Sequence, residues 1–302
     1  MKSDSLTVAS RQIIWGARTY VMAILNVTTD SFSGDGLLAQ NEEDSQESYV
    51  QEALNQARIC LQAGADILDI GGESSRPGAL PVSTDEEISR VLPVIQSVAA
   101  ELDTIISVDT YKAEVAEAAL QAGAHMINDV WGLRADPELG KVASKYRAPI
   151  VLMHNRSSWV HADIKERLGG RYVGMEYDDL LNDVKRELLE SVELAHRQGI
   201  PDDHIILDPG IGFGKTVEQN LDLINRLGEL REPGYPLLLG ASRKSFIGYT
   251  LNLPPDQRIE GTAAAVAIGI DRGADIIRVH DVAYMVRVAR MSDAISRRRT
   301  IK

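Results

Sequence analysis

The sequence predicts a (β/α)8 barrel, the fold also called a TIM barrel, and two observations lead to that prediction. First, short apolar runs alternate with segments of helical length along the 302 residues. Second, one phrase recurs where a helix passes into a strand. In each copy a glycine suits the left-handed conformation that ends many helices, and an apolar strand follows at once. The copies read QAGADILD at 62–69, QAGAHMIN at 121–128 and RGADIIR at 272–278.

Counting with this pattern gives eight strand–helix units. Barrels of this kind have about 250 residues, so we expect one domain over residues 1–302, with the barrel proper at about 20–298. The strands are expected at 21–26, 66–71, 104–108, 125–129, 149–154, 204–208, 236–240 and 275–279. The helices are expected at 43–63, 84–101, 111–122, 136–146, 176–198, 216–230, 258–272 and 281–297.

Smaller signals refine this plan. An N-terminal β-hairpin is expected before the barrel, with strands at 8–15 and 18–23 on either side of a turn at Gly16. Residues 83–87 (STDEE) have the form of a capping box, and Pro137 suits the first turn of a helix. An open, doubly wound sheet is the alternative fold, but its glycine-rich dinucleotide motif does not occur.

Composition narrows the class of protein. A net charge of −12 and an isoelectric point near 5.0 argue against nucleic acid or an anionic membrane as the main partner. The single cysteine, Cys60, cannot form an internal disulfide, which favours a reducing cytoplasm. The polar first twelve residues lack the apolar core of a signal peptide, and no apolar run approaches the ~20 residues of a membrane span.

The segment at 204–215 (HIILDPGIGFGK) attracts attention because an apolar strand runs directly into Asp208 and then into a loop with three glycines. Glycines let a backbone turn sharply and approach a ligand closely. The spacing fits neither the phosphate-binding loop nor the dinucleotide fingerprint. A simple turn in which Asp208 caps the loop is the alternative interpretation.

Polar residues follow nearly every predicted strand. Barrel enzymes build their active sites at these carboxyl ends, and although any one residue could be a cap or a rim group, the whole set favours a site. The residues are Asn26, Glu73, Ser75, Arg76, Asp109, Asn128, Asp129, His154, Asp208, Ser242, Arg243, Lys244, Arg278 and His280.

The residue types indicate the chemistry of the predicted site. Arg243, Lys244, Arg278 and His280 follow strands seven and eight, where such barrels usually bind phosphate. A rim salt bridge to a nearby aspartate is the alternative for these cations. Amides and carboxylates elsewhere could read a heterocycle. The pattern predicts no zinc cage, but Asn26 and substrate phosphates could hold Mg²⁺.

Ordered motifs over almost the whole chain resemble dihydropteroate synthases. The family adopts a (β/α)8 barrel and condenses 6-hydroxymethyl-7,8-dihydropterin diphosphate with 4-aminobenzoate, releasing pyrophosphate with Mg²⁺ present. The resemblance also implies a cytoplasmic homodimer that is inhibited by sulfonamides. The motifs are LNVTTDSFS at 25–33, DIGGESSRPG at 69–78, SVDT at 107–110, IND at 127–129, DPGIGFGK at 208–215, SRK at 242–244, GTAAA at 261–265 and RVH at 278–280.

The resemblance assigns roles to matching residues, among which Asp109, Asp208, Lys244, Arg278 and His280 are the catalytic set. The pterin would be held by Asp109, Asn128, Asp208 and Lys244, in a slot lined by Met153 and Phe213. The diphosphate would be bound by Asn26, Arg278 and His280, with Asn26 also a Mg²⁺ ligand. The aminobenzoate would be surrounded by Ser75, Arg76, Pro77 and Ser242, under loops 27–42 and 73–80.

Three departures from the family pattern occur: Thr29 replaces a proline, Ser75 replaces a threonine, and residues 154–157 read HNRS. The last change concerns the detail of the fifth loop. Because an arylamine is already a nucleophile, no Ser–His or Cys–His pair is needed, and a dissociative substitution is favoured. Two alternatives are a pterin-dependent methyltransferase barrel, which has little use for the cations, and a non-catalytic pterin-binding paralogue.

Overall fold

A computed structural model describes residues 2–28, 46–76, 78–157, 162–165, 167–173 and 176–297. Its main sheet has eight parallel strands in the order β10-β7-β6-β5-β4-β3-β12-β11. The amide of Leu207 donates to the carbonyl of Pro236 at 3.0 Å, which joins β10 to β11 and closes the barrel. The strands are β3 (Tyr20–Asn26), β4 (Ile67–Gly71), β5 (Ile105–Asp109), β6 (Met126–Asp129), β7 (Ile150–Met153), β10 (Ile205–Asp208), β11 (Leu238–Leu239) and β12 (Ile276–Val279).

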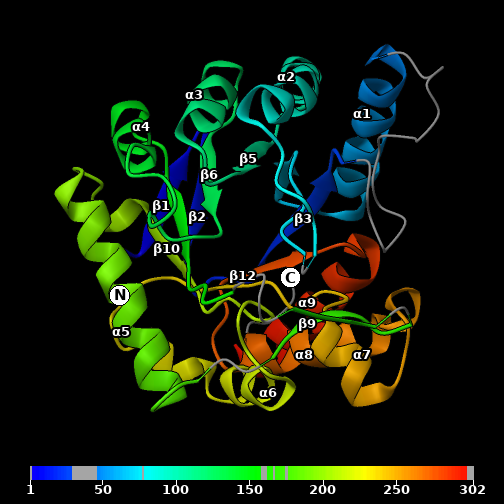
Figure 1. The fold of residues 1–302 in the computed structure, drawn as a ribbon. Helices are drawn as coiled ribbons and strands as arrows, with labels where there is room; N and C mark the ends of the chain where they lie inside the picture. Colours follow the sequence, from blue (N-terminus) through cyan, green and yellow to red (C-terminus); the bar gives the residue numbers. More distant parts are fainter. Residues whose placement is uncertain are drawn as a thin grey trace.

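Helices surround this barrel, as Figure 1 shows. The predicted (β/α)8 fold is confirmed, because each of the eight predicted helices has a counterpart. α7 is additional and was not predicted. The helices are α1 (Gln46–Ala63), α2 (Thr84–Glu101), α3 (Ala113–Gln121), α4 (Leu139–Tyr146), α5 (Leu180–Arg197), α6 (Val217–Asn225), α7 (Ser245–Leu251), α8 (Ile259–Asp271) and α9 (Val282–Ser296).

The N-terminal hairpin exists, but its predicted position was wrong. Its strands are β1 (Ser5–Val8) and β2 (Arg11–Ile14), so the turn lies at Ala9 and Ser10 rather than at Gly16. Gly16, at φ +71°, instead turns the chain into β3. The apolar residues around Gly16 belong to two different elements, and the glycine signal marked the junction between them.

The long loop after β7 contains a second hairpin that was not predicted, formed by β8 (Ala162–Lys165) and β9 (Gly169–Tyr172). The helix starts also differ in detail. Ser83 caps α2 by accepting from the Glu86 amide at 3.2 Å, whereas the Glu86 carboxylate pairs with Arg90 and does not complete a capping box. α4 begins three residues after Asp136, whose carboxylate accepts from the first amide of α3 at 2.8 Å.

Two hydrophobic clusters form the core. The larger cluster lies between the strands and the helices around them. The smaller one fills the amino-terminal end of the barrel, where alternate strand residues such as Met22 meet Leu6 and Ile13 of the hairpin and Trp15, which follows it. Because side chains alternate across a strand, β3 serves both clusters. The hairpin therefore plugs the end of the barrel opposite the polar strand ends.

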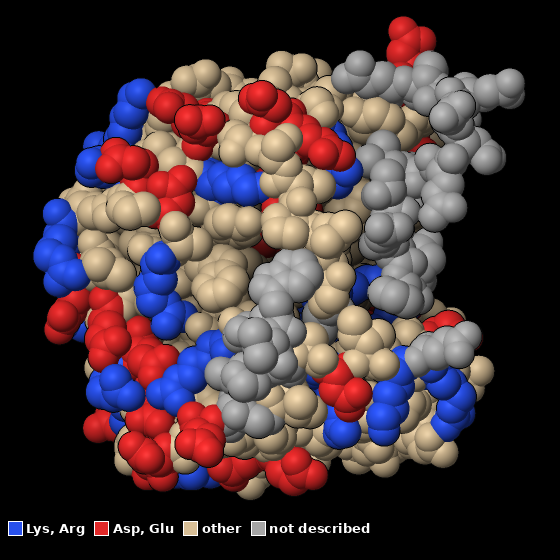
Figure 2. Space-filling model, in the orientation of Figure 1, with Lys and Arg blue, Asp and Glu red and all other residues tan. Residues whose placement is uncertain are grey.

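Charged groups of both signs share the surface. On the face in Figure 2, Lys and Arg residues lie beside Asp and Glu residues rather than in a separate field. None of the helices in the described ranges combines the length and apolar character that a membrane span requires.

Candidate active site

One cavity of about 180 Å³ lies at the carboxyl ends of the barrel strands. Every predicted binding residue within the described ranges lines it, whereas Pro77 and most of loop 27–42 lie outside those ranges. The chain therefore brings together groups from all eight strand ends or the loops after them. These residues are Asn26, Ser75, Arg76, Asp109, Asn128, Met153, Asp208, Phe213, Ser242, Lys244, Arg278 and His280.

Asp69 is the central residue of this cluster, and sequence reasoning missed it. Its carboxylate is fully buried and accepts from Asn128 Nδ2 at 3.0 Å and from Arg278 Nε at 2.5 Å. The second arm of Arg278, Nη2, donates to Asp109 Oδ2 at 2.5 Å. Asp69 thus joins an amide expected at the pterin to a guanidinium expected at the diphosphate. The available signal was a lone carboxylate inside the apolar run of β4.

Burial and charge set the protonation of this cluster. Burial raises the pKa of Asp109 to about 7. The Arg278 charge opposes this rise, and the Asp69 charge adds to it. Burial alone would lower the pKa of Arg278, but the charges of Asp69 and Asp109 raise it overall. Arg278 therefore stays charged, while Asp109 can change its protonation state near neutral pH.

The glycine-rich segment brings Asp208 and Lys244 to the same wall. Asp208 Oδ1 accepts from the Gly210 amide at 2.7 Å, and the Lys244 ammonium donates to the carbonyl of Ile211. The ammonium also lies 4.5 Å from the centre of the Phe213 ring. Burial lowers the pKa of Lys244 to about 8 and raises that of Asp208. Asp208 therefore caps the turn through Oδ1, as the alternative interpretation predicted, and it also lines the cavity.

At the ends of the neighbouring strands β12 and β11, His280 pairs with Ser242. The hydroxyl oxygen of Ser242 lies 3.0 Å from Nδ1 of His280 and accepts from the His280 amide at 3.2 Å. Burial and the neighbouring cations lower the pKa of His280 well below its usual value, so the ring is neutral. The predicted alternative of a rim salt bridge applies to Arg243, whose Nε and Nη2 bind Asp281 at 2.8 and 2.6 Å. Arg278 instead points inward.

Loop 73–82 is held at its two ends by Lys112, which was not predicted. The ammonium donates to Glu73 Oε2 at 2.6 Å, to the Val82 carbonyl at 2.7 Å and to Glu87 Oε2 at 2.7 Å. Tyr111 donates to the other oxygen of Glu73 at 2.9 Å. We call this cluster of Glu73, Val82, Glu87, Tyr111 and Lys112 the loop neck. It positions the loop that carries Ser75 and Arg76 over the cavity.

The β8–β9 hairpin supplies a further stretch of cavity wall through Gly169 and Gly170. It rests on α7, where the Tyr249 ring contacts the Arg171 guanidinium at 4.2 Å and the Lys165 ammonium at 5.5 Å. His154, by contrast, is buried behind the cavity. Its Nε2 lies 3.0 Å from Glu187, and its Nδ1 lies 2.9 Å from Lys215.

The donor set limits which metal ion could bind. The described residues contain no group of three or more His, Cys, Asp or Glu side chains suited to a metal. Asn26 offers a single amide oxygen in the cavity wall. This arrangement fits a hard cation such as Mg²⁺ that takes its other ligands from phosphate and water.

The barrel and its cavity of amides, carboxylates and cations define a pterin-binding barrel enzyme. The family described as pterin binding enzyme matches residues 22–280. More particularly, the chain belongs to the dihydropteroate synthase family, which confirms the resemblance drawn from its motifs.

Named relatives support this assignment. The dihydropteroate synthase of Clostridium beijerinckii is 47% identical over 97% of this chain and 100% of its own length. A Clostridium difficile dihydropteroate synthase crystallised in the presence of pteroic acid has a TM-score of 0.83 and 45% identity, covering 94% of this chain and 98% of that one. The Xanthomonas albilineans enzyme with 4-aminobenzoic acid has a TM-score of 0.84 and 38% identity, covering 97% of this chain and 98% of that one.

Proposed function

We propose that this barrel condenses 6-hydroxymethyl-7,8-dihydropterin diphosphate with 4-aminobenzoate to form 7,8-dihydropteroate and pyrophosphate. It is a transferase of folate biosynthesis. The observation that carries the proposal is that one cavity holds both the amide–carboxylate wall suited to a pterin and the Arg–His wall suited to a diphosphate. A related enzyme has been crystallised with pteroic acid and another with 4-aminobenzoic acid.

The pterin end of the substrate is assigned to Asn128, Asp208 and Lys244. A pterin ring offers both donors and acceptors along its edges, so it requires an amide, a carboxylate and an ammonium together. Asn128 and Asp208 are 3% and 5% exposed, and this burial strengthens each polar contact with the ring. Phe213 and Met153 also line the cavity and would pack against its faces.

The diphosphate end is assigned to Arg278, His280 and Asn26. Arg278 has N–H groups beyond the two that bind Asp69 and Asp109. These donors would stabilise the charge that develops on the leaving diphosphate. Mg²⁺, held by Asn26 and phosphate oxygens, would neutralise part of the same charge when bound.

The arylamine is assigned to the mouth of the cavity, beside Ser75, Arg76 and Ser242. Its nitrogen needs no activating base, because an arylamine is nucleophilic when neutral. We infer a dissociative substitution in which the carbon–oxygen bond to diphosphate breaks ahead of attack. Asp109 and Asp208 would stabilise the positive charge that develops on the pterin methylene.

The experiment that tests this proposal is pyrophosphate release from dihydropterin diphosphate, with and without 4-aminobenzoate and Mg²⁺. Release that requires both, with dihydropteroate formed in equal amount, is the expected result. Pterin binding without either product would instead favour the methyltransferase or the non-catalytic paralogue. Methyl transfer from methyltetrahydrofolate to a corrinoid acceptor distinguishes these two.

The cellular context is part of the proposal. A cytoplasmic homodimer is the assembly that the family resemblance implies. The free thiol of Cys60 is buried, which suits a reducing compartment. Light scattering of the purified protein at assay concentration measures the mass directly, and a monomeric mass would contradict the dimer.

A further inference from the structure

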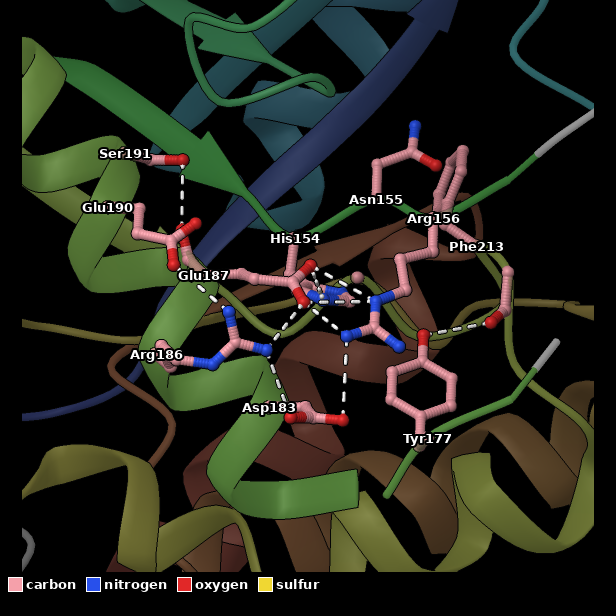
Figure 3. A network of polar contacts seen from close by, with 12 residues as sticks. His154, Asn155, Arg156, Tyr177, Asp183, Arg186, Glu187, Glu190, Ser191 and Phe213 are labelled. Atoms are coloured by element: carbon pink, nitrogen blue, oxygen red, sulfur yellow. Dashed lines mark hydrogen bonds and ion pairs between the residues drawn. The ribbon is translucent and has the colours of Figure 1, made fainter. Parts of the chain in front are cut away.

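A buried chain of polar groups connects helix α5 to the glycine-rich loop at residues 208–215. Glu187 on α5 approaches His154 Nε2 at 3.0 Å, and His154 Nδ1 lies 2.9 Å from Lys215 Nζ. His154 and Lys215 are only 1% and 2% exposed. Figure 3 shows the side chains of Glu187 and His154 facing each other. None of these three residues lines the cavity.

The protonation of this chain follows from its partners. Although burial alone would raise the pKa of Glu187, hydrogen bonds from His154 and Arg156 lower it overall, so the carboxylate is ionised. Burial and the Lys215 charge lower the pKa of His154 to about 3, so the ring is neutral. A neutral ring beside a carboxylate carries its proton on Nε2, which leaves Nδ1 as an acceptor. Lys215 must therefore be the donor to Nδ1.

Lys215 uses its remaining donors on the glycine-rich loop. Its ammonium binds the Gly210 carbonyl at 2.9 Å and the Phe213 carbonyl at 3.0 Å. With His154, these give three acceptors for the three N–H groups of a charged lysine. Burial lowers the pKa of Lys215 well below its usual value, against the charges of Asp208 and Glu187. The three acceptors at 2.9–3.0 Å nevertheless require the three N–H groups of the ammonium form. Glu187 is therefore a counter-charge for an ammonium that shapes the loop.

Backbone contacts leave the loop little freedom to adopt another shape. Gly210 and Gly214 have φ of +69° and +64°. A side chain at Gly210 would meet the His154 carbonyl oxygen at 1.8 Å, and one at Gly214 would meet the backbone of Arg156 at 2.5 Å. Tyr177 donates to the Gly214 carbonyl at 2.9 Å. The fifth loop and the glycine-rich loop therefore pack as one unit.

The functional consequence lies at the cavity wall, because the same loop carries Phe213 and receives Lys244. The carbonyl of Phe213 accepts a hydrogen bond from Lys215. The ring of Phe213 lies 4.5 Å from the Lys244 ammonium. The Ile211 carbonyl accepts from Lys244. Two groups assigned to the pterin thus depend on the loop shape that Lys215 maintains.

We propose that Glu187 and Lys215 are positioning residues that act through His154 and the glycine-rich loop to set the pterin slot. This inference rests on the proposed function, since the pterin is the ligand that the slot would receive. It also assigns a role to the atypical fifth loop, whose His154 and Arg156 both bind Glu187. A change at Glu187 should therefore affect the pterin and spare the arylamine.

The test compares Glu187→Gln and Lys215→Met with Glu190→Gln in the full-length protein. Glu190 lies on the same helix, pairs with Arg186 and has a side chain that is 54% exposed, so it matches the chemical change without touching the loop. Three quantities are measured: the Kd of a dihydropterin lacking diphosphate, the KM of each substrate, and hydrogen exchange of the amides at 210–216. Thermal unfolding shows which variants fold.

Glu187→Gln and Lys215→Met should each raise the pterin Kd and KM about tenfold or more, since small misplacements of binding groups carry losses of this size. The aminobenzoate KM should stay within about twofold, and the amides at 210–216 should exchange faster. Glu190→Gln should match the wild type. Unchanged pterin affinity in both folded variants, equal losses for both substrates, or the same loss in Glu190→Gln would overturn the proposal.

The exchange measurement needs no substrate, so it separates this inference from the proposed function. A wild-type protein that binds no pterin would overturn the assigned ligand. The positioning role would still be tested by the hydrogen exchange rates of the amides at 210–216. Unchanged exchange there in both variants would refute it whatever the ligand.

Discussion

Replacing Lys112 with methionine should loosen the loop neck and destabilise the barrel by an amount that depends on pH. The ammonium is the partner of both Glu73 and Glu87, at 2.6 and 2.7 Å, and the Glu87 side chain is only 1% exposed. Removing one partner of a buried ion pair costs about 3–5 kcal/mol. Glu73 is more accessible, at 14%, so we expect about 3 kcal/mol at pH 8.

Lower pH should reduce this loss. Burial already raises the pKa of Glu87, and removing Lys112 raises it further. A carboxyl group with a folded-state pKa above its unfolded value is protonated more readily in the native state. The destabilisation is therefore smallest at low pH and grows as pH rises toward the folded pKa, at about 1.4 kcal/mol per unit of pKa difference.

Thermal unfolding at pH 5 and pH 8 measures this difference. For 302 residues the unfolding entropy is about 0.6 kcal/mol per kelvin, so 3 kcal/mol corresponds to a fall in Tm of about 5 °C. The double variant Lys112→Met with Glu87→Gln should recover most of the loss, because no buried charge is left unpaired. The reasoning is refuted if the loss is the same at both pH values and the second substitution restores nothing.

Among folded variants, the aminobenzoate KM should rise more than the pterin KM.

Three further predictions concern the cavity. Arg278→Ala should lower kcat/KM with dihydropterin diphosphate by about a hundredfold or more. The affinity for a pterin without diphosphate should fall less in direct binding, because that ligand loses only the support that Arg278 gives to Asp69 and Asp109. Equal losses for both ligands would contradict the assignment. Asp208→Asn should weaken pterin binding by about tenfold or more, since a hydrogen bond to a charged group is lost, with the circular dichroism spectrum unchanged; wild-type affinity would make Asp208 only a turn residue. Finally, kcat/KM for the pterin substrate should follow a bell-shaped pH profile. Asp109 must lose its proton as pH rises through about 7, and Lys244 loses its proton as pH rises through about 8. A low-pH limb that persists in Asp109→Asn would show that Asp109 does not cause it.

The repeated helix–glycine–strand phrase made the barrel predictable, since each copy combines a cap with a buried strand of the right length. The elements that escaped prediction lack such signals. α7 has seven residues and directly follows the SRK motif, and β8–β9 lies in a loop whose residues alternate too weakly to indicate strands. The first hairpin was misplaced because Gly16 marks a junction between elements, whereas Ala9 at φ +53° makes the turn.

The site was predictable where strand ends carry polar groups, because the barrel brings those ends together whatever the detail of the loops. Asp69, Lys112 and Glu187 were not predicted. Each acts on the site through another residue, and its partners come from elements distant in the sequence, such as the pair of Asp69 with Arg278. Periodicity and motif spacing describe where a residue lies along one element, and carry no information on which distant residue it will meet.

The plug at the amino-terminal end of the barrel has a consequence for the order of events in catalysis. Leu6, Ile13 and Trp15 close that end with packed side chains. A ligand that reaches buried Asn128 and Asp208 therefore passes the exposed Ser75 at the mouth of the cavity. Because the cavity is closed at one end, both ligands must enter and leave through the other end. We therefore expect the pterin substrate, which is assigned to the bottom of the cavity, to bind first, and the aminobenzoate bound above it to block its release.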